Sequence, residues 1–504
     1  MSRAKVLFIN PIPSQMALVS PVVSLFYGIL KKSDIDLKFF DTTFYDVSDQ
    51  HLDSNKVRES TLAVKVVRGE AITPSDQVKG YADLLEQFRQ TALDYQPTVI
   101  MASSMESTMN FTRQMLAHVR DLGIPHILGG VFPTFAPEVA VDYPEVDAIC
   151  VGEGESIIVP MVERILTGES LEGLENTWVK TAGGGIVKSP LSPPSPMDDI
   201  PRFDLTPYSE SRFYRAMSGK MYRMFPVESH RGCPLKCTFC NSPLQDETYL
   251  KETGQRYFRG RSVAKVMEDV RYFVEEGKAE YLFFWADNFL AYSMNEIDEF
   301  CAAYAEFKTP FYVQSYPVSL HEEKIRKLKE VGLHRVGLGL EHGNEAFRRD
   351  IIRRPYSNAK AIEKMAILNK YNVEYSINNI VGFPTETPEL HWDTVLLNRA
   401  LTPDTSSCSI FTPFQGTILR DLCIEKGYME DDPSILAPTN NDNSILNMPD
   451  FSKEEIAGKS RTFNFYLKFP EDRFDEIAKA EKMTPEGDKV WEALRQEYKE
   501  NYAS

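Results

Sequence analysis

The chain has 504 residues, of which 42% are hydrophobic, and its formal net charge is −17. This length and composition allow two or three domains with cores of their own. The negative charge repels phosphate backbones and makes nucleic acid a poor candidate for the main partner. The N-terminal segment reads as a strand rather than an export leader, and no apolar run approaches the ~20 residues of a membrane span. We therefore expect a cytoplasmic protein without a transmembrane segment.

Segments of strand and helix character alternate between residue 5 and about residue 168. Amphipathic stretches at 111–123 and 156–168 predict helices. Short apolar runs predict strands at 5–10, 36–42, 98–104, 126–130 and 147–152. Strands that alternate with helices in this way are typical of a doubly wound parallel sheet. We therefore predict an α/β fold that starts with a Rossmann-like domain at residues 1–170.

A proline-rich run at residues 189–209 interrupts this pattern. Because proline lacks a backbone N–H and has a fixed φ, such a density prevents regular structure. We place a linker at residues 171–221.

A second series of strands and helices follows the linker. Strand-like segments occur at 224–232, 279–287, 310–317, 335–341, 374–384 and 406–413, and helical stretches such as 263–277 and 321–332 lie between them. Six such units in a row predict a partial (β/α)6 barrel at residues 222–428. A mainly helical C-terminal extension is expected at residues 429–504, ending in a charged helix.

Three of the seven cysteines lie within one short stretch, "RGCPLKCTFC", as Cys233, Cys237 and Cys240. The other four are single and the total is odd, which does not resemble a disulfide framework. The stretch follows the first predicted barrel strand and so lies at the rim where barrels of this type hold their chemistry. Three thiolates at C-x3-C-x2-C favour an iron–sulfur cluster with one iron open to a ligand. The alternatives are a Cys3His zinc site with His230 and buried free cysteines.

The cysteine motif, with Phe239 before its last cysteine, resembles that of the radical S-adenosylmethionine (SAM) superfamily. The resemblance implies a [4Fe-4S] cluster held by the three cysteines, whose open iron binds the methionine part of SAM. It also implies that electron transfer from the cluster cleaves SAM to methionine and a 5′-deoxyadenosyl radical. The reductant would be an electron donor such as flavodoxin or ferredoxin.

Other strand ends of the predicted barrel match the same family. By resemblance, Asp287 would bind the amino group of SAM, and Glu341 would contact its ribose. Gly382 and Pro384, in "GFPTET", would border the adenine, and Phe239 would also belong to the SAM site. Each feature has a structural alternative, because Asp287 could cap a helix and "GFP" could be an ordinary turn. The sequence assigns no catalytic side chain.

The N-terminal domain resembles the cobalamin-binding domains that precede some radical SAM barrels. The resemblance rests on "ILGGVFPTFAPE" and "VDAICVGEGES" at 127–138 and 146–156. It implies that Gly129 and Gly130 allow close approach of the cobalamin tail. The other residues implied to bind cobalamin are Ser103, Ser104, Thr108, Gly152 and Glu153. The alternative is a plain Rossmann-like domain whose glycines serve turns.

The motif D-x-H-x-x-G, with which some cobalamin domains ligate cobalt, is absent after the first strand. "FINPIPSQM" contains no histidine, and "DQHLDS" at 49–54 follows the second strand and lacks the final glycine. We therefore expect no histidine as the lower axial ligand.

Together these resemblances imply a cobalamin-dependent radical SAM enzyme. The function we expect is a methyltransferase that moves a methyl group from SAM through methylcobalamin to an unactivated carbon, or a phosphinate phosphorus, of a small-molecule or peptide substrate. A non-methylating cyclase, rearrangement or oxidation enzyme is the alternative. A cobalamin-binding sensor or carrier is disfavoured by the intact cysteine triad, and a tRNA methylthiotransferase by the lack of a second cysteine-rich domain and of a basic RNA-binding appendage.

Overall fold

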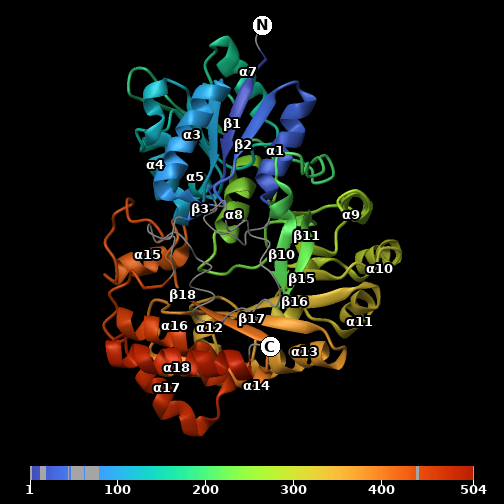
Figure 1. The fold of residues 1–504 in the computed structure, drawn as a ribbon, viewed down its shortest axis with the longest axis vertical. Helices are drawn as coiled ribbons and strands as arrows, with labels where there is room; N and C mark the ends of the chain where they lie inside the picture. The colour runs from blue at the N-terminus through green and yellow to red at the C-terminus, as the bar shows by residue number, and fades with distance from the viewer. Residues whose placement is uncertain are drawn as a thin grey trace.

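The computed structural model describes residues 3–11, 19–43, 45–46, 62, 79–438 and 442–502. Two seven-stranded sheets dominate the described residues. The N-terminal sheet lies above the second one in Figure 1, and the C-terminal helices lie at the bottom of the view. A Rossmann-like domain thus lies on top of a second α/β domain in this view.

The first sheet has five parallel strands in the order β2-β1-β5-β6-β7. They are β1 (Lys5–Ile9), β2 (Asp36–Phe40), β5 (Val99–Ser103), β6 (His126–Gly129) and β7 (Ala148–Cys150). Helices α1 (Pro21–Lys32) and α7 (Ile158–Thr167) share a core with one face of β1. Helices α3 (Tyr81–Tyr95) and α4 (Met109–His118) pack with its other face. The predicted doubly wound fold is confirmed, and each predicted strand is present.

The predicted linker at 171–221 is too wide. Strands β8 (Thr177–Lys180) and β9 (Ile186–Lys188) extend the first sheet in antiparallel fashion. Strand β10 (Tyr214–Met217) pairs antiparallel with β11 (Lys220–Glu228) at the edge of the second sheet. Within 171–221 the longest stretch without strands or helices is the proline-rich run between β9 and η4 (Glu210–Phe213), as its composition requires. A strand of three residues such as β9 is too short to be recognised from a hydrophobic pattern.

The second sheet is the predicted partial barrel. Six parallel strands follow in chain order from β11 through β14 (Tyr281–Trp285), β15 (Phe311–Ser315), β16 (Leu333–Glu341), β17 (Glu374–Val381) and β18 (Thr405–Ile410). Within the described residues β18 does not pair with β11, so the barrel is open. The outer layer comprises helices α9 (Val263–Glu275), α10 (Met294–Tyr304), α11 (Glu322–Val331), α13 (Asn358–Lys370) and α14 (Pro388–Leu401). All the carboxyl ends of the strands therefore meet at one rim.

The C-terminal extension is helical, as predicted. It contains α16 (Lys453–Lys468), α17 (Phe474–Ala480) and α18 (Pro485–Asn501). Helix α16 packs against β17 and β18, and its Phe463 and Phe465 are buried in the core that it shares with them. The extension therefore packs against the end of the barrel and supports it.

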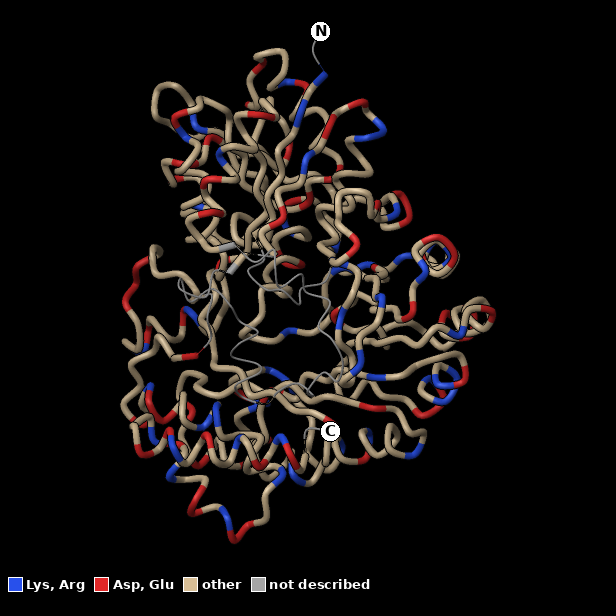
Figure 2. Tube along the Cα trace, in the orientation of Figure 1, with Lys and Arg blue, Asp and Glu red and all other residues tan. Residues whose placement is uncertain are grey.

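Charges of both signs are interleaved on the outer helices (Figure 2). All seven cysteines are free, in agreement with the absence of a disulfide framework. No helix in the described part of the chain has the length and apolarity that crossing a membrane requires.

Candidate functional site: a cavity between the two domains

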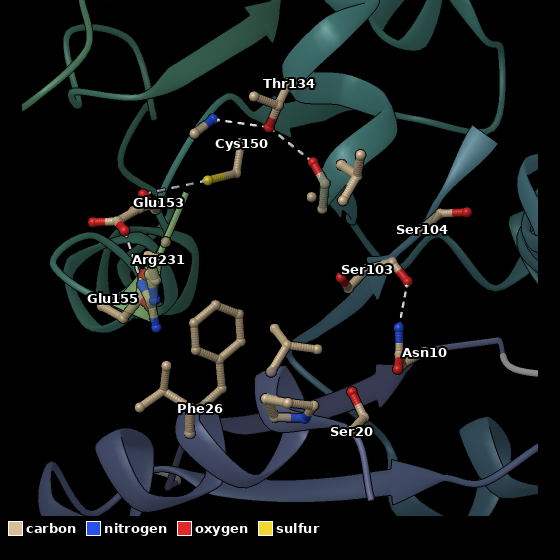
Figure 3. Close-up of a pocket in the computed structure, with 18 of the residues that line it drawn as sticks. Asn10, Ser20, Phe26, Ser103, Ser104, Thr134, Cys150, Glu153, Glu155 and Arg231 are labelled. Atoms are coloured by element: carbon tan, nitrogen blue, oxygen red, sulfur yellow. Dashed lines mark hydrogen bonds and ion pairs between the residues drawn. The ribbon is translucent and has the colours of Figure 1, made fainter. Parts of the chain in front are cut away.

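A cavity of about 690 Å³ lies where the strand ends of the first sheet face the barrel. Six of the seven residues predicted to bind cobalamin line it: Ser103, Ser104, Gly129, Gly130, Gly152 and Glu153. The seventh, Thr108, lies behind Ser104, with their hydroxyl oxygens 3.0 Å apart. Figure 3 shows Ser103 and Ser104 on one side of the cavity and Glu153 on the other. The sequence motifs are thus gathered around one space.

Gly130 has a backbone conformation that only glycine adopts readily, with φ +100° and ψ −164°. A Cβ at this position would lie 2.7 Å from the backbone nitrogen of Ser104. The Gly130 carbonyl accepts a hydrogen bond from the Thr134 hydroxyl at 2.8 Å, and that hydroxyl accepts one from the Gly152 N–H at 3.0 Å. A Cβ on Gly129 would make only ordinary contacts. Close packing against Ser104 therefore requires glycine at position 130, while the approach of a cobalamin tail to the glycine pair stays a prediction.

The lining of the cavity is suited to a large cofactor with polar groups at its edge. Phe8, Leu25, Phe26 and Met101 contribute apolar wall, and the volume lies within the roughly 300–1,000 Å³ typical of cofactor sites. Asn10 also lines the cavity, and among the described residues its buried Oδ1 has no hydrogen-bond donor. An amide or hydroxyl donor of a ligand would satisfy this oxygen. These residues fit cobalamin. The segments considered for an axial histidine lie, at residues 12–18 and 49–54, outside the described residues.

The cysteine loop connects β12 (His230–Arg231) to α8 (Ser242–Thr253) at the barrel rim. Cys237 is buried, and Cys233 and Cys240 are partly exposed. The Thr238 hydroxyl donates to the Ile351 carbonyl at 2.5 Å and the Asn241 amide to the Gln415 carbonyl at 2.8 Å. The loop is therefore held from two sides before any metal binds.

The surroundings of His230 bear on the alternative of a Cys3His zinc site. Among the described residues, no three metal-ligating side chains are close enough to hold one metal ion. A zinc site needs thiolates converging at about 2.3 Å on a single centre, whereas a cubane cluster binds each thiolate through a different iron. His230 is buried, and its ring packs on Phe258 and Tyr292. The packing of the His230 ring disfavours the Cys3His alternative, while the [4Fe-4S] cluster is assigned to the three cysteines by the family resemblance.

Asp287 lies at the end of β14 and lines the same cavity. Its carboxylate opens into the cavity, yet the protein around it raises its pKa through desolvation. The nearest hydrogen-bond donor is the Ser242 hydroxyl, at 3.4 Å from Oδ2. No Lys, Arg or His of the described chain forms an ion pair with this carboxylate. The group is thus suited to an ammonium ligand, as the resemblance implied for SAM.

Glu341 ends β16 with φ +68°, an unusual conformation for a residue with a side chain. Its Oε1 lies 3.1 Å from Nη1 of Arg354, and Nε of Arg354 donates to the Cys237 sulfur at 3.1 Å. The Arg354 guanidinium also lies over the Phe239 ring, 5.5 Å from its centroid. Arg354 therefore joins three residues that were predicted independently, although sequence reasoning missed it. The cation can stabilise a thiolate or hold an anionic ligand.

The "GFPTET" turn is fixed by a buried carboxylate. Gly382 has φ +83°, and both Gly382 and Pro384 are buried. The N–H groups of Gly382 and Phe383 donate to Oε2 of Glu386 at 2.6 and 3.0 Å, and His342 Nε2 lies 3.1 Å from Oε1. The Phe383 ring also meets Phe239 edge-to-face at 5.9 Å. The predicted adenine-bordering residues therefore lie beside the cysteine loop.

Two family models match the chain. The radical SAM superfamily model covers residues 227–397 and the B12 binding domain model covers residues 67–160. The chain belongs to the B12-binding radical SAM proteins. The predicted family, fold class and cofactor set are thus confirmed, with [4Fe-4S], SAM and cobalamin as the expected groups.

The relatives of this radical SAM protein include named methyltransferases. It is 28% identical over 361 residues to an uncharacterized methyltransferase of Pyrococcus horikoshii, covering 68% of this chain and 72% of that protein. It is 24% identical over 420 residues to cytidylyl-2-hydroxyethylphosphonate methyltransferase of Streptomyces wedmorensis, covering 74% and 75%. The structure of the radical SAM methyltransferase TsrM from Kitasatospora setae, with cobalamin and a [4Fe-4S] cluster bound, matches with a TM-score of 0.66. At 13% identity over 100% of this chain and 99% of TsrM, that match shows the fold.

Changing Gly130 to alanine is expected to weaken cobalamin binding at least tenfold. The left-handed conformation costs a side-chain residue about 1–3 kcal/mol, and the Cβ would press on the Ser104 backbone. Titration with hydroxocobalamin, followed by absorption, measures the affinity. Gly168→Ala is the control, because its φ is +75° but its Cβ would meet nothing within 4 Å. Equal affinities of the two variants would contradict the assignment.

Changing Asp287 to asparagine is expected to weaken SAM binding by about 1.5–3 kcal/mol, or roughly tenfold to 150-fold. Hydrogen bonds to charged groups contribute about this much, and asparagine keeps the shape while removing the charge. Equilibrium dialysis with the cluster-loaded protein measures the affinity. Glu247→Gln, at an exposed carboxylate of α8, serves as control. An Asp287→Asn protein with wild-type affinity for SAM would show that another group binds the ammonium.

Proposed function

We propose that this protein is a cobalamin-dependent radical SAM methyltransferase. The observation that carries the proposal is that six of the predicted cobalamin residues line the same cavity as Asp287, Gly232 and Ser242 of the barrel rim. The SAM site at Asp287 would therefore adjoin the cobalamin site, and a substrate between them would meet both. The names of two relatives support methyl transfer.

When bound, the cluster, SAM and cobalamin would supply the reductive cleavage of SAM and the transfer of a methyl group. The residues of this chain would bind and orient them. Cys233, Cys237 and Cys240 would hold the cluster, and Asp287 would bind the ammonium of SAM. Burial raises the pKa of the Cys233 thiol to about 12, so iron has to displace its proton.

The remaining residues would shape the site and limit the access of water. The apolar wall around Phe8, Phe26 and Met101 would surround the cobalamin, and Ser103, Ser104 and Asn10 would contact its polar edge. Phe239 and the Gly382–Pro384 turn would border the adenine, and Glu341 would approach the ribose. The methyl acceptor would be an unactivated carbon or a phosphinate phosphorus of a small molecule or peptide. An electron donor such as flavodoxin or ferredoxin would reduce the cluster.

Isotope tracing tests the methyl transfer directly. The reconstituted protein would be incubated anaerobically with a reductant, a panel of small metabolites and peptides, and SAM carrying a deuterated methyl group. A product that gains the deuterated methyl group would support the proposal. A product that forms without the label would contradict methyl transfer and support the alternative of a cyclase, rearrangement or oxidation enzyme.

A further inference from the structure

A loop of the N-terminal domain, residues 151–155, forms one wall of the cavity and also reaches the barrel. Gly152, Glu153 and Glu155 line the cavity, and the facing wall includes Arg231 and Gly232. Gly232 directly precedes Cys233 in the sequence. A molecule that fills the cavity therefore contacts Gly232, the residue directly before the first cysteine of the cysteine loop.

On the first flank of the cysteine loop, Arg231 is held by carboxylates of both domains. Its Nη1 lies 2.8 Å from Oε1 of Glu153 and 2.5 Å from Oε1 of Glu155, and its Nε lies 2.8 Å from Oε1 of Glu228. The Arg231 side chain is only 13% exposed. Arg259 forms a second ion pair with Glu153. Figure 3 shows Glu153, Glu155 and Arg231 together at one side of the cavity.

On the second flank, the same loop contacts helix α8. The Glu153 N–H donates to the Tyr249 hydroxyl at 2.9 Å. Gly152 has φ +80°, and a Cβ there would lie 2.3 Å from that hydroxyl oxygen. Helix α8 starts at Ser242, two residues after Cys240. The loop at 151–155 thus contacts the chain both before and after the three cysteines.

The charges of this contact make it sensitive to small displacements. Glu153, Glu155 and Glu228 face the guanidinium groups of Arg231 and Arg259, and all five side chains are largely removed from water. Separating one buried charge from its partner leaves the other unpaired and desolvated. A displacement of the 151–155 loop would therefore act on Arg231 and, through it, on the chain next to Cys233.

We propose that the contact between the 151–155 loop and Arg231 couples the two cofactor sites energetically. Loading of the cluster strengthens cobalamin binding, and cobalamin in turn alters the surroundings of the cluster, because coupling between two sites is reciprocal. Arg231 and Glu155 act as positioning residues, through the loops and not on the reacting atoms. The inference rests on the proposed function to the extent that both cofactors must bind.

The test compares cobalamin affinities of the full-length protein with and without the reconstituted cluster. Anaerobic titration with hydroxocobalamin is expected to give at least about fivefold tighter binding to the cluster-loaded wild type. Glu155→Gln keeps the shape but removes one charge, and Arg231→Lys keeps the charge but loses the planar fork. Both variants are expected to bring the ratio of affinities close to one. If Arg231→Lys does not load the cluster, Glu155→Gln still decides the outcome.

Arg120→Lys provides a matched control. Arg120 forms a bidentate pair with Asp147 in the same domain, at 2.7 and 2.6 Å, and neither residue lines the cavity. This variant is expected to keep the wild-type ratio. The electron paramagnetic resonance spectrum of the reduced cluster gives a second measurement that needs no turnover. Cobalamin is expected to shift it in the wild type and in Arg120→Lys, but not in Glu155→Gln.

The outcomes separate this inference from the proposed function. Wild-type protein that binds both cofactors with a ratio of one would overturn the coupling and leave the proposed function standing. A ratio that is raised equally in the wild type and in Glu155→Gln would show that coupling does not run through this contact. Wild-type protein that binds neither cofactor would overturn both.

Discussion

Alanine in place of Cys237 is expected to abolish cluster binding and all reductive cleavage of SAM. Besides the three cysteines, residues 232–241 contain no Cys, His, Asp or Glu that could replace a lost ligand of the cluster. Arg354 would also lose its contact with the Cys237 sulfur and keep those with Glu341 and the Gly339 carbonyl. Iron and sulfide content, with the visible absorption of the cluster, measure the loss.

Cys301→Ala is the control for this prediction. Cys301 is a partly buried free cysteine on α10, away from the strand ends. The variant is expected to retain the iron content and the absorption of the wild type. Full iron content in Cys237→Ala would contradict the assignment of the cluster to the loop between β12 and α8.

Loss of the Glu386 carboxylate is expected to destabilise the protein by about 3–5 kcal/mol, the usual cost of breaking a buried charged network. Glu386→Ala would leave the N–H groups of Gly382 and Phe383 without their acceptor and His342 without its partner. Denaturation with urea, monitored by circular dichroism, measures the change. Glu389→Ala, an exposed carboxylate three residues further on, is expected to unfold like the wild type. Similar unfolding of Glu386→Ala would show that the turn does not depend on this residue.

The same carboxylate predicts a dependence of stability on pH. Burial raises the pKa of Glu386, but the hydrogen bond with His342 and the nearby His391 ring, 3.6 Å away, outweigh this effect and lower the pKa to about 2. Because the folded-state pKa lies below the ordinary value of about 4.3, its contribution is present above that pH and is lost as the pH falls toward 2. The difference in unfolding free energy between wild type and Glu386→Gln is therefore expected to shrink between pH 5 and pH 2. A difference that stays constant over this range would contradict the assignment.

The positions of candidate site residues could be predicted from the sequence where these residues lie at the carboxyl end of a strand. Cys233, Asp287, Glu341 and Gly382 each come after an apolar run, and parallel strands bring their carboxyl ends to one rim. The positions of these residues therefore followed from the strand pattern, while their roles came from the resemblance. The same reasoning placed Ser104 and Gly130 on one edge of the first sheet.

Residues that act through long-range contacts were not predictable in this way. Arg354 lies in a basic stretch after α12 (Glu345–Asp350) and resembles an ordinary surface arginine until folding brings it to Cys237, 117 residues earlier. Glu153 was assigned to cobalamin, but the structure also pairs it with Arg231, 78 residues later. No local periodicity encodes such pairs, because they depend on how the two domains stack.

The proposed function requires that one chain bind a cluster, SAM and cobalamin. The most direct test is anaerobic reconstitution with iron, sulfide and hydroxocobalamin, followed by reduction in the presence of SAM and measurement of S-adenosylhomocysteine and 5′-deoxyadenosine. With a substrate present, both products are expected to form. Gly130→Ala is expected to lower the amount of S-adenosylhomocysteine, and Cys237→Ala is expected to eliminate 5′-deoxyadenosine. Formation of 5′-deoxyadenosine by Cys237→Ala at the wild-type rate, or absence of bound cobalamin in the wild type, would contradict the account.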